Sequence, residues 1–77
     1  MVTYKLNRKK ISIEEFENVD VFGITAIKNG EVVLNVEDIS ANELFVLEIM
    51  RKLAEYEVSL YHVMDVIEDE MYAYAFI

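Results

Sequence analysis

An Asn29-Gly30 pair stands between two runs of β-branched and aromatic residues, and it constrains the fold more than any other feature of the sequence. Both residues tolerate the positive φ angles that a two-residue type I′ turn requires. The run of residues 19–27 is apolar on both faces of an extended chain, which indicates a central strand. After the pair, Val32, Leu34 and Val36 fall on one side of an extended chain. The sequence therefore predicts an antiparallel hairpin in the middle of the chain.

A further strand is expected before this hairpin. Residues 2–6 are apolar at every second position, which gives one apolar face at period two. Residues 11–13 resume the alternation with the opposite parity, so a bulge or break is expected within residues 7–10. Residues 14–18 are read as a turn or irregular loop. The first half of the chain is thus predicted to form a three-stranded antiparallel meander.

The second half changes to helical periodicity. Ser40 and Glu43 match a capping box, and the helix is expected to run to about Glu55. Ser59 is placed as the N-cap of a second helix. A connection of a few residues makes the two helices neighbours, packed on one face of the sheet. The predicted fold class is α+β, in the order β-β-β-α-α.

Size and composition indicate one domain over residues 1–77, with apolar surface to spare. The chain has no cysteine, which excludes disulfides and thiolate zinc sites. With Gly counted in place of Tyr, slightly more than half of the residues are apolar, above the range of about 45–50% for globular domains. Residues 72–77 either continue the second helix or form an aromatic C-terminal tail that packs on its own domain or on another molecule.

Charge narrows the classes of partner. The net charge of −8 disfavours nucleic acid and anionic membrane surfaces, because both require clustered cations. The one basic cluster, formed by Lys5, Arg8, Lys9 and Lys10, is either a guarded strand edge or an anion site. No stretch approaches the ~20 apolar residues of a membrane span, and no signal peptide is recognisable. The cytoplasm is therefore the expected compartment.

The sequence offers no catalytic apparatus. Two of its three serines are read as helix caps, and nothing places a base beside Ser12. Gly23 and Gly30 are the only glycines and neither opens a helix, so no phosphate-binding loop is expected. Gly23 lies within a strand, where glycine usually marks a bulge or a close approach of backbone. We expect no enzyme activity, no catalytic residue and no cofactor.

His62, Asp65 and Asp69 are the weak candidates for a metal site. Their spacing places an imidazole and two carboxylates on one helical face, which suits a divalent cation. One helix rarely completes a coordination shell, so a solvated polar face is the competing interpretation.

Aromatic residues gather in the C-terminal half, and this residue class is enriched in protein interfaces. The leading hypothesis is a non-enzymatic protein-interaction module, acting as a homodimer or binding another protein. The alternative is a small ligand- or metal-binding regulatory protein that uses the His62, Asp65 and Asp69 face. The candidate partner-binding residues are Phe45, Tyr56, Tyr61, Tyr72, Tyr74 and Phe76.

Several short segments also carry a resemblance. They are Phe22-Gly23-Ile24, Gly30-Glu31, Glu37-Asp38-Ile39-Ser40, and His62 with Asp65-Val66-Ile67-Glu68-Asp69. Together they resemble a family of very short bacterial proteins known only as a domain of unknown function.

The sequence departs from the pattern of this family at two positions. Leu60 follows Ser59 where the family tends to have proline, and Glu70 stands where it tends to have an apolar residue. The resemblance implies a small cytoplasmic bacterial protein. Because the family has no established activity, it assigns no catalytic residue.

Overall fold

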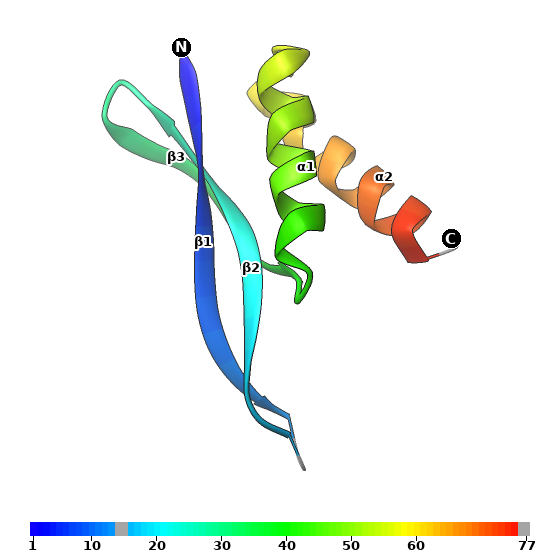
Figure 1. Ribbon diagram of the computed structural model, residues 1–77. Helices are drawn as coiled ribbons and strands as arrows, with labels where there is room; N and C mark the ends of the chain where they lie inside the picture. The colour runs from blue at the N-terminus through cyan, green and yellow to red at the C-terminus, as the bar shows by residue number, and fades with distance from the viewer. Residues whose placement is uncertain (14–15, 76–77) are drawn as a thin grey trace.

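The computed structural model describes residues 1–13 and 16–75, and Figure 1 shows three strands followed by two helices. The strands pair antiparallel in the order β1-β2-β3, so the predicted meander and the α+β class are confirmed. The elements are β1 (Val2–Ile13), β2 (Phe16–Lys28), β3 (Glu31–Ser40), α1 (Glu43–Glu55), the 3₁₀ turn η1 (Leu60–His62) and α2 (Val63–Ala75).

The central hairpin forms where the sequence predicts it. Asn29 and Gly30 have φ angles of 53° and 79°, the left-handed values that the turn requires. The prediction that Val32 shares a face with Leu34 and Val36 is wrong. The β2–β3 register shifts between Ala26 and Ile27, which puts Val32 opposite Ile27 and leaves it exposed.

β1 is continuous, so the prediction of a break within residues 7–10 is wrong. Asn7 pairs with Gly23 and Lys10 pairs with Asp20 without interruption. The ladder is regular from Val2 to Ile11, so Ile11 lies on the opposite face from Leu6, and the register shifts only between Ile11 and Ile13. β2 begins at Phe16, within the segment 14–18 that the sequence assigned to a turn.

Gly23 lies at the closest approach between two strands. Opposite it, β3 carries extra residues: Ile24 pairs with Val36 but Phe22 pairs with Ser40. This bulge brings the carbonyl oxygen of Val36 against the α-carbon of Gly23, where a β-carbon would overlap it. The side-chain amide of Asn7 covers the same position and donates a hydrogen bond to that carbonyl (3.1 Å).

α1 begins later than the capping box predicts. Its N-cap is Asn42, whose Oδ1 accepts a hydrogen bond from the backbone N–H of Phe45 (3.2 Å). Ser40 still belongs to β3, and its hydroxyl accepts from the backbone N–H of Asn42 (3.0 Å). The bulge in β3 extends the strand to Ser40, so the chain needs two more residues before the helix starts.

Asn42→Ala is expected to lower the free energy of unfolding by about 1 kcal/mol, the usual cost of an N-cap. Asn42 also donates from Nδ2 to the Tyr74 hydroxyl (3.0 Å), so Tyr74→Phe measures that second bond separately. Urea denaturation of both variants gives the two values. A loss in Ser40→Ala larger than that in Asn42→Ala would restore Ser40 as the cap.

The second helix also starts later than expected. The Ser59 hydroxyl accepts from the backbone N–H of Tyr61 (3.3 Å), so Ser59 caps η1, and α2 follows from Val63. α2 runs to Ala75, so residues 72–75 continue the helix, which is one of the two alternatives that the sequence left open for this segment. Phe76 and Ile77 lie outside the described residues.

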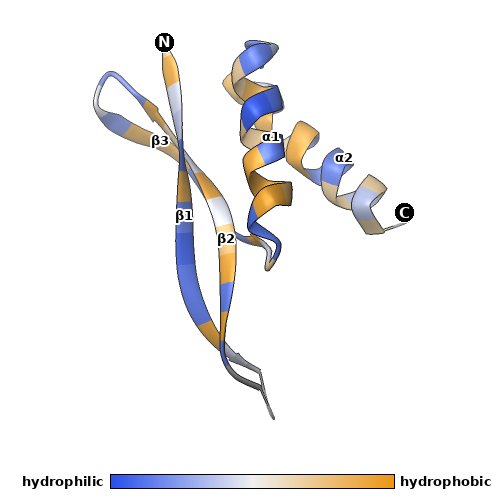
Figure 2. Cartoon of the chain, in the orientation of Figure 1, coloured by the Kyte–Doolittle hydropathy of each residue, from blue (hydrophilic) through white to orange (hydrophobic). Residues whose placement is uncertain are grey.

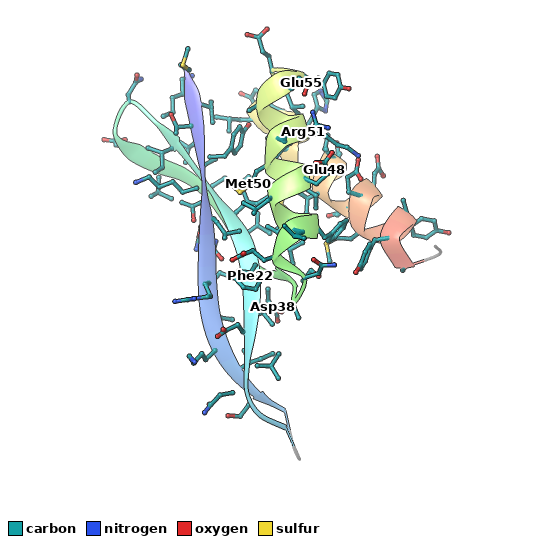
Figure 3. The ribbon with its side chains drawn as sticks, viewed as in Figure 1. Phe22, Asp38, Glu48, Met50, Arg51 and Glu55 are labelled. Atoms are coloured by element: carbon teal, nitrogen blue, oxygen red, sulfur yellow. The ribbon has the colours of Figure 1, made fainter. Side chains whose placement is uncertain are left out.

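Both helices lie on the same side of the sheet, as predicted, but in two layers. α1 packs on all three strands, and α2 packs on α1 (Figure 1). Figure 2 shows orange apolar segments where these elements meet. Phe22 reaches the core from β2, below Met50 of α1 (Figure 3). The buried core consists of Phe22, Ile24, Ile39, Val46, Ile49, Leu53, Val63 and Ile67.

Beyond Phe22, β1 and β2 continue without β3 as a two-stranded arm that extends past the helices (Figure 1). The arm consists of residues 8–13 and 16–21. It makes the molecule elongated, with a radius of gyration of 13.0 Å against roughly 11.5 Å for a compact chain of this length.

Candidate interaction surface

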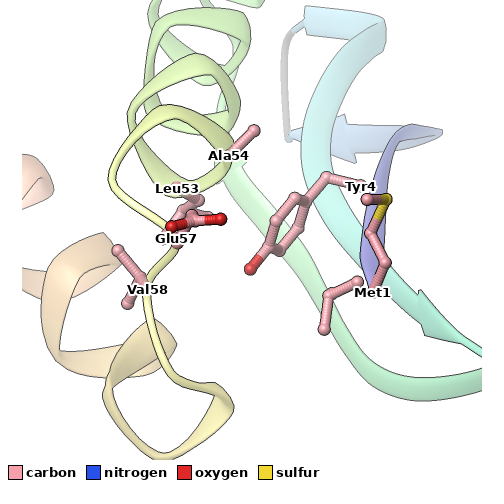
Figure 4. Close-up of a pocket in the computed structure, with 7 residues that line it drawn as sticks. Met1, Tyr4, Leu53, Ala54, Glu57 and Val58 are labelled. Carbon is pink, nitrogen blue, oxygen red and sulfur yellow. The ribbon is translucent and has the colours of Figure 1, made fainter.

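An apolar groove runs between the free edge of the sheet and α1. We call it the β1–α1 groove. It comprises two adjoining hollows of about 430 and 480 Å³, and Figure 4 shows the first. Its walls come from the start of β1 and the second half of α1, namely Met1, Val2, Thr3, Tyr4, Leu47, Met50, Arg51, Leu53, Ala54, Glu57 and Val58.

Tyr4 stands in the middle of this groove. Its ring extends from β1 toward α1 and the segment around Val58 (Figure 4). Burial raises the pKa of the Tyr4 hydroxyl above its ordinary value of 10.0, because the ionised form loses hydration there. The groove is thus a partly desolvated surface that favours apolar and neutral groups.

The α1 wall of the groove is bordered by an ion-pair network. Arg51 donates to Glu48 through Nη2 (2.6 Å) and Nε, and to Glu55 through Nη1. Figure 3 shows the three side chains along the outward face of α1. The hydrogen bond from Arg51 lowers the pKa of Glu48. The network holds Arg51 at the rim and leaves Leu47 and Ala54 to form the apolar wall.

β1 is an outer strand of the sheet, and it carries the basic cluster. Lys5, Arg8, Lys9 and Lys10 are all exposed along it. Lys10 lies 3.8 Å from a carboxylate oxygen of Asp20 on the neighbouring strand. The cluster therefore lies on a strand edge, as its interpretation as a guarded edge requires.

Two of the predicted partner-binding residues contact each other. Phe45 of α1 and Tyr74 of α2 stack with ring centroids 4.2 Å apart and an interplanar angle of 19°. The C-terminal aromatic segment thus packs on its own chain through Tyr74. Tyr56, Tyr61 and Tyr72 are exposed on three separate segments: the end of α1, η1 and α2. Phe76 lies outside the described residues.

The structure brings together only part of the His62, Asp65 and Asp69 group. Nδ1 of His62 lies 3.5 Å from a carboxylate oxygen of Asp65, and both side chains are exposed. Asp69 lies one turn further along α2. Within residues 1–13 and 16–75, no three His, Asp or Glu side chains are grouped closely enough to hold a metal ion.

α2 carries a net charge of −4, half of the −8 of the whole chain. It contains Asp65, Glu68, Asp69 and Glu70 and no Lys or Arg. Glu70 accepts a hydrogen bond from Lys52 of α1 (2.9 Å), which raises the pKa of Lys52 and links the two helices. The other three carboxylates face solvent beside Met64 and Met71.

Sequence reasoning missed the groove. It selected aromatic residues by type, whereas aliphatic side chains and Met50 form most of the walls. The available signal was the width of the apolar stripe on α1, because Leu47 and Ala54 extend it beyond the face that the core uses. Recognising the groove also required knowing that β1 is an outer strand.

The helices described in this structure include none that is long and apolar enough to cross a membrane.

Comparison with known proteins gives a family with no established activity. No curated protein and no solved structure matches the chain. The model of the Family of unknown function DUF6514 matches residues 1–73, from the first strand into α2. The chain therefore belongs to this family of unknown function, in agreement with the resemblance drawn from its short segments.

Proposed function

We propose that this chain is a non-enzymatic protein-interaction module that acts as a homodimer. The observation that carries the proposal is its surface. The chain exposes 5673 Å², whereas a compact monomer of 9.0 kDa is expected to expose roughly 4,850 Å². The two-stranded arm contributes to this excess, and an interface of standard size would cover about 800 Å² on each partner.

The nature of this surface supports a protein partner. The β1–α1 groove is mainly apolar, and large apolar side chains elsewhere are exposed, including Leu44 at the start of α1. Contiguous apolar surface of this kind usually marks an interaction site. The net charge of −8 argues against nucleic acid and anionic membranes as the partner.

The proposal takes the protein to be bacterial and cytoplasmic, as its resemblance to short bacterial proteins implies.

The alternative, a ligand- or metal-binding regulatory protein, stays a prediction. It depends on His62, Asp65 and Asp69, of which only the first two lie within contact distance.

Light scattering across a hundredfold dilution tests the homodimer. We expect a mass near 18 kDa, twice the 9.0 kDa of one chain, that falls toward the monomer value only at the lowest concentrations. The physical reason is that pairing would cover exposed apolar surface, and stable interfaces of standard size cover about 800 Å² on each partner. A mass of 9.0 kDa at every concentration would refute the homodimer.

A further inference from the structure

Resting on the proposed homodimer, we propose that the two subunits join edge to edge through β1. The two β1 strands pair antiparallel about a two-fold axis at Tyr4, and the two three-stranded sheets become one six-stranded sheet. The two β1–α1 grooves then face each other across the axis. The occupant of each groove is thus the first strand and α1 flank of a second copy.

A partner at this site must pair with the free edge of β1 and also fill the groove. The edge of β1 offers unpaired backbone N–H and C=O groups, which another extended strand satisfies. The groove needs apolar side chains on the face toward the helix. β1 itself meets both demands, because Val2, Tyr4 and Leu6 project from that one face of the strand. The surface is therefore self-complementary, as a two-fold interface requires.

Apolar matching selects the register. With Tyr4 opposite the partner's Tyr4, Val2 lies opposite the partner's Leu6, and Lys5 lies opposite the partner's Thr3. Both sheets then keep their helices on the same side, because directly opposed residues share a face. The basic residues 8–10 fall outside this short ladder, beyond the partner's first strand residue.

Registers centred further along β1 oppose cations to each other or to apolar side chains. Centring the axis on Lys5 opposes it to the partner's Lys5, and centring it on Asn7 opposes Lys5 to the partner's Lys9. Centring it on Leu6 opposes Val2 to the partner's Lys10 and Tyr4 to the partner's Arg8. Directly opposed like charges destabilise a pair of strands, and a cation opposite an apolar side chain forfeits the packing of that pair.

The main competing surface is the outward face of α2, with Met64 and Met71. In a two-fold dimer the same patch meets itself. This patch carries Asp65, Glu68 and Asp69, and α2 has no cation to oppose them. Self-association there would bring six carboxylates together, whereas the Tyr4-centred ladder of β1 brings the two Lys5 side chains no closer than a diagonal.

The register is tested by two charge variants at Thr3, an exposed residue of β1. Thr3→Glu places a carboxylate opposite the partner's Lys5 twice per dimer, whereas Thr3→Lys places an ammonium there. We expect the dissociation constant of Thr3→Lys to exceed that of Thr3→Glu about tenfold at low salt. This difference should largely disappear at 1 M salt, where the screening length is about 3 Å. Equal constants at low salt would overturn the register.

The groove is tested by a matched pair of helix variants. Leu47 and Met64 are similarly exposed, at 39% and 36%, and they lie on α1 and α2 respectively. Leu47→Lys should weaken the dimer at least about a hundredfold, because it buries two charges at the interface. Met64→Lys should leave the dissociation constant within about twofold. Circular dichroism shows whether each variant remains folded.

The outcomes separate this inference from the proposal on which it rests. A wild-type monomer at every concentration overturns both. A wild-type dimer that Met64→Lys disrupts and Leu47→Lys does not overturns the β1 interface and leaves the homodimer standing. A dimer that depends on Leu47, and on the sign of the charge at Thr3, supports both.

Discussion

Gly23→Ala is expected to lower the free energy of unfolding by at least about 3 kcal/mol, in a domain whose total stability should be about 4–11 kcal/mol. A β-carbon at this position would overlap the carbonyl oxygen of Val36 and lie 2.9 Å from the α-carbon of Glu37. Both atoms are backbone, so neither can move without shifting β3. The added carbon would also lie 2.6 Å from Oδ1 of Asn7 and disturb the hydrogen bond that Asn7 donates to Val36.

Gly30→Ala is the matched control for this prediction. Gly30 has a φ of 79° but no atom within 4 Å of an added β-carbon, so its replacement tests backbone strain without steric overlap. The expected cost is about 1 kcal/mol. Urea denaturation gives both free energies of unfolding. Both variants are measured at the same protein concentration, because the apparent stability of a dimer depends on concentration. Equal losses in the two variants would show that overlap with β3 contributes nothing.

Leu53→Ala is expected to cost about 2–5 kcal/mol, the second largest effect. Leu53 is fully buried in the core beneath α1, among side chains from the sheet and from α2. Truncation removes transfer free energy and leaves a cavity, because neighbours on three layers cannot all close in. The midpoint of urea denaturation should fall accordingly.

Leu44→Ala provides the same chemical change on the same helix at a site that is 75% exposed. It should change the stability by no more than about 0.5 kcal/mol. A loss in Leu44→Ala comparable to that in Leu53→Ala would mean that Leu44 is covered in solution. Such a result would extend the proposed interface to the first turn of α1.

Features set by neighbouring residues were the ones predicted well. The turn at Asn29 and Gly30 depends on the φ preferences of two residues, and the structure confirms it. The end of α1 at Glu55 follows from helical periodicity and is also confirmed.

Features set by contacts between distant residues were predicted poorly. The sequence predicts Ser40 as the N-cap, whereas in the structure Ser40 is the last residue of β3. β3 reaches Ser40 because of the bulge opposite Gly23, which lies on another strand. The same holds for the candidate site. The stacking of Phe45 on Tyr74 depends on how α2 crosses α1, which no local pattern encodes.

The two-stranded arm has a consequence for how sequences of this family can vary in length. β3 leaves β2 at Phe22, the arm extends past both helices, and the buried core described above begins at Phe22 of β2. Each strand of the arm can therefore gain or lose two residues. Because side chains alternate with a period of two, every remaining side chain keeps its face, and the strand pairing from Phe22 toward the helices is unchanged. Insertions and deletions should accumulate at the tip of the arm, whereas the segment around Gly23 should keep its length.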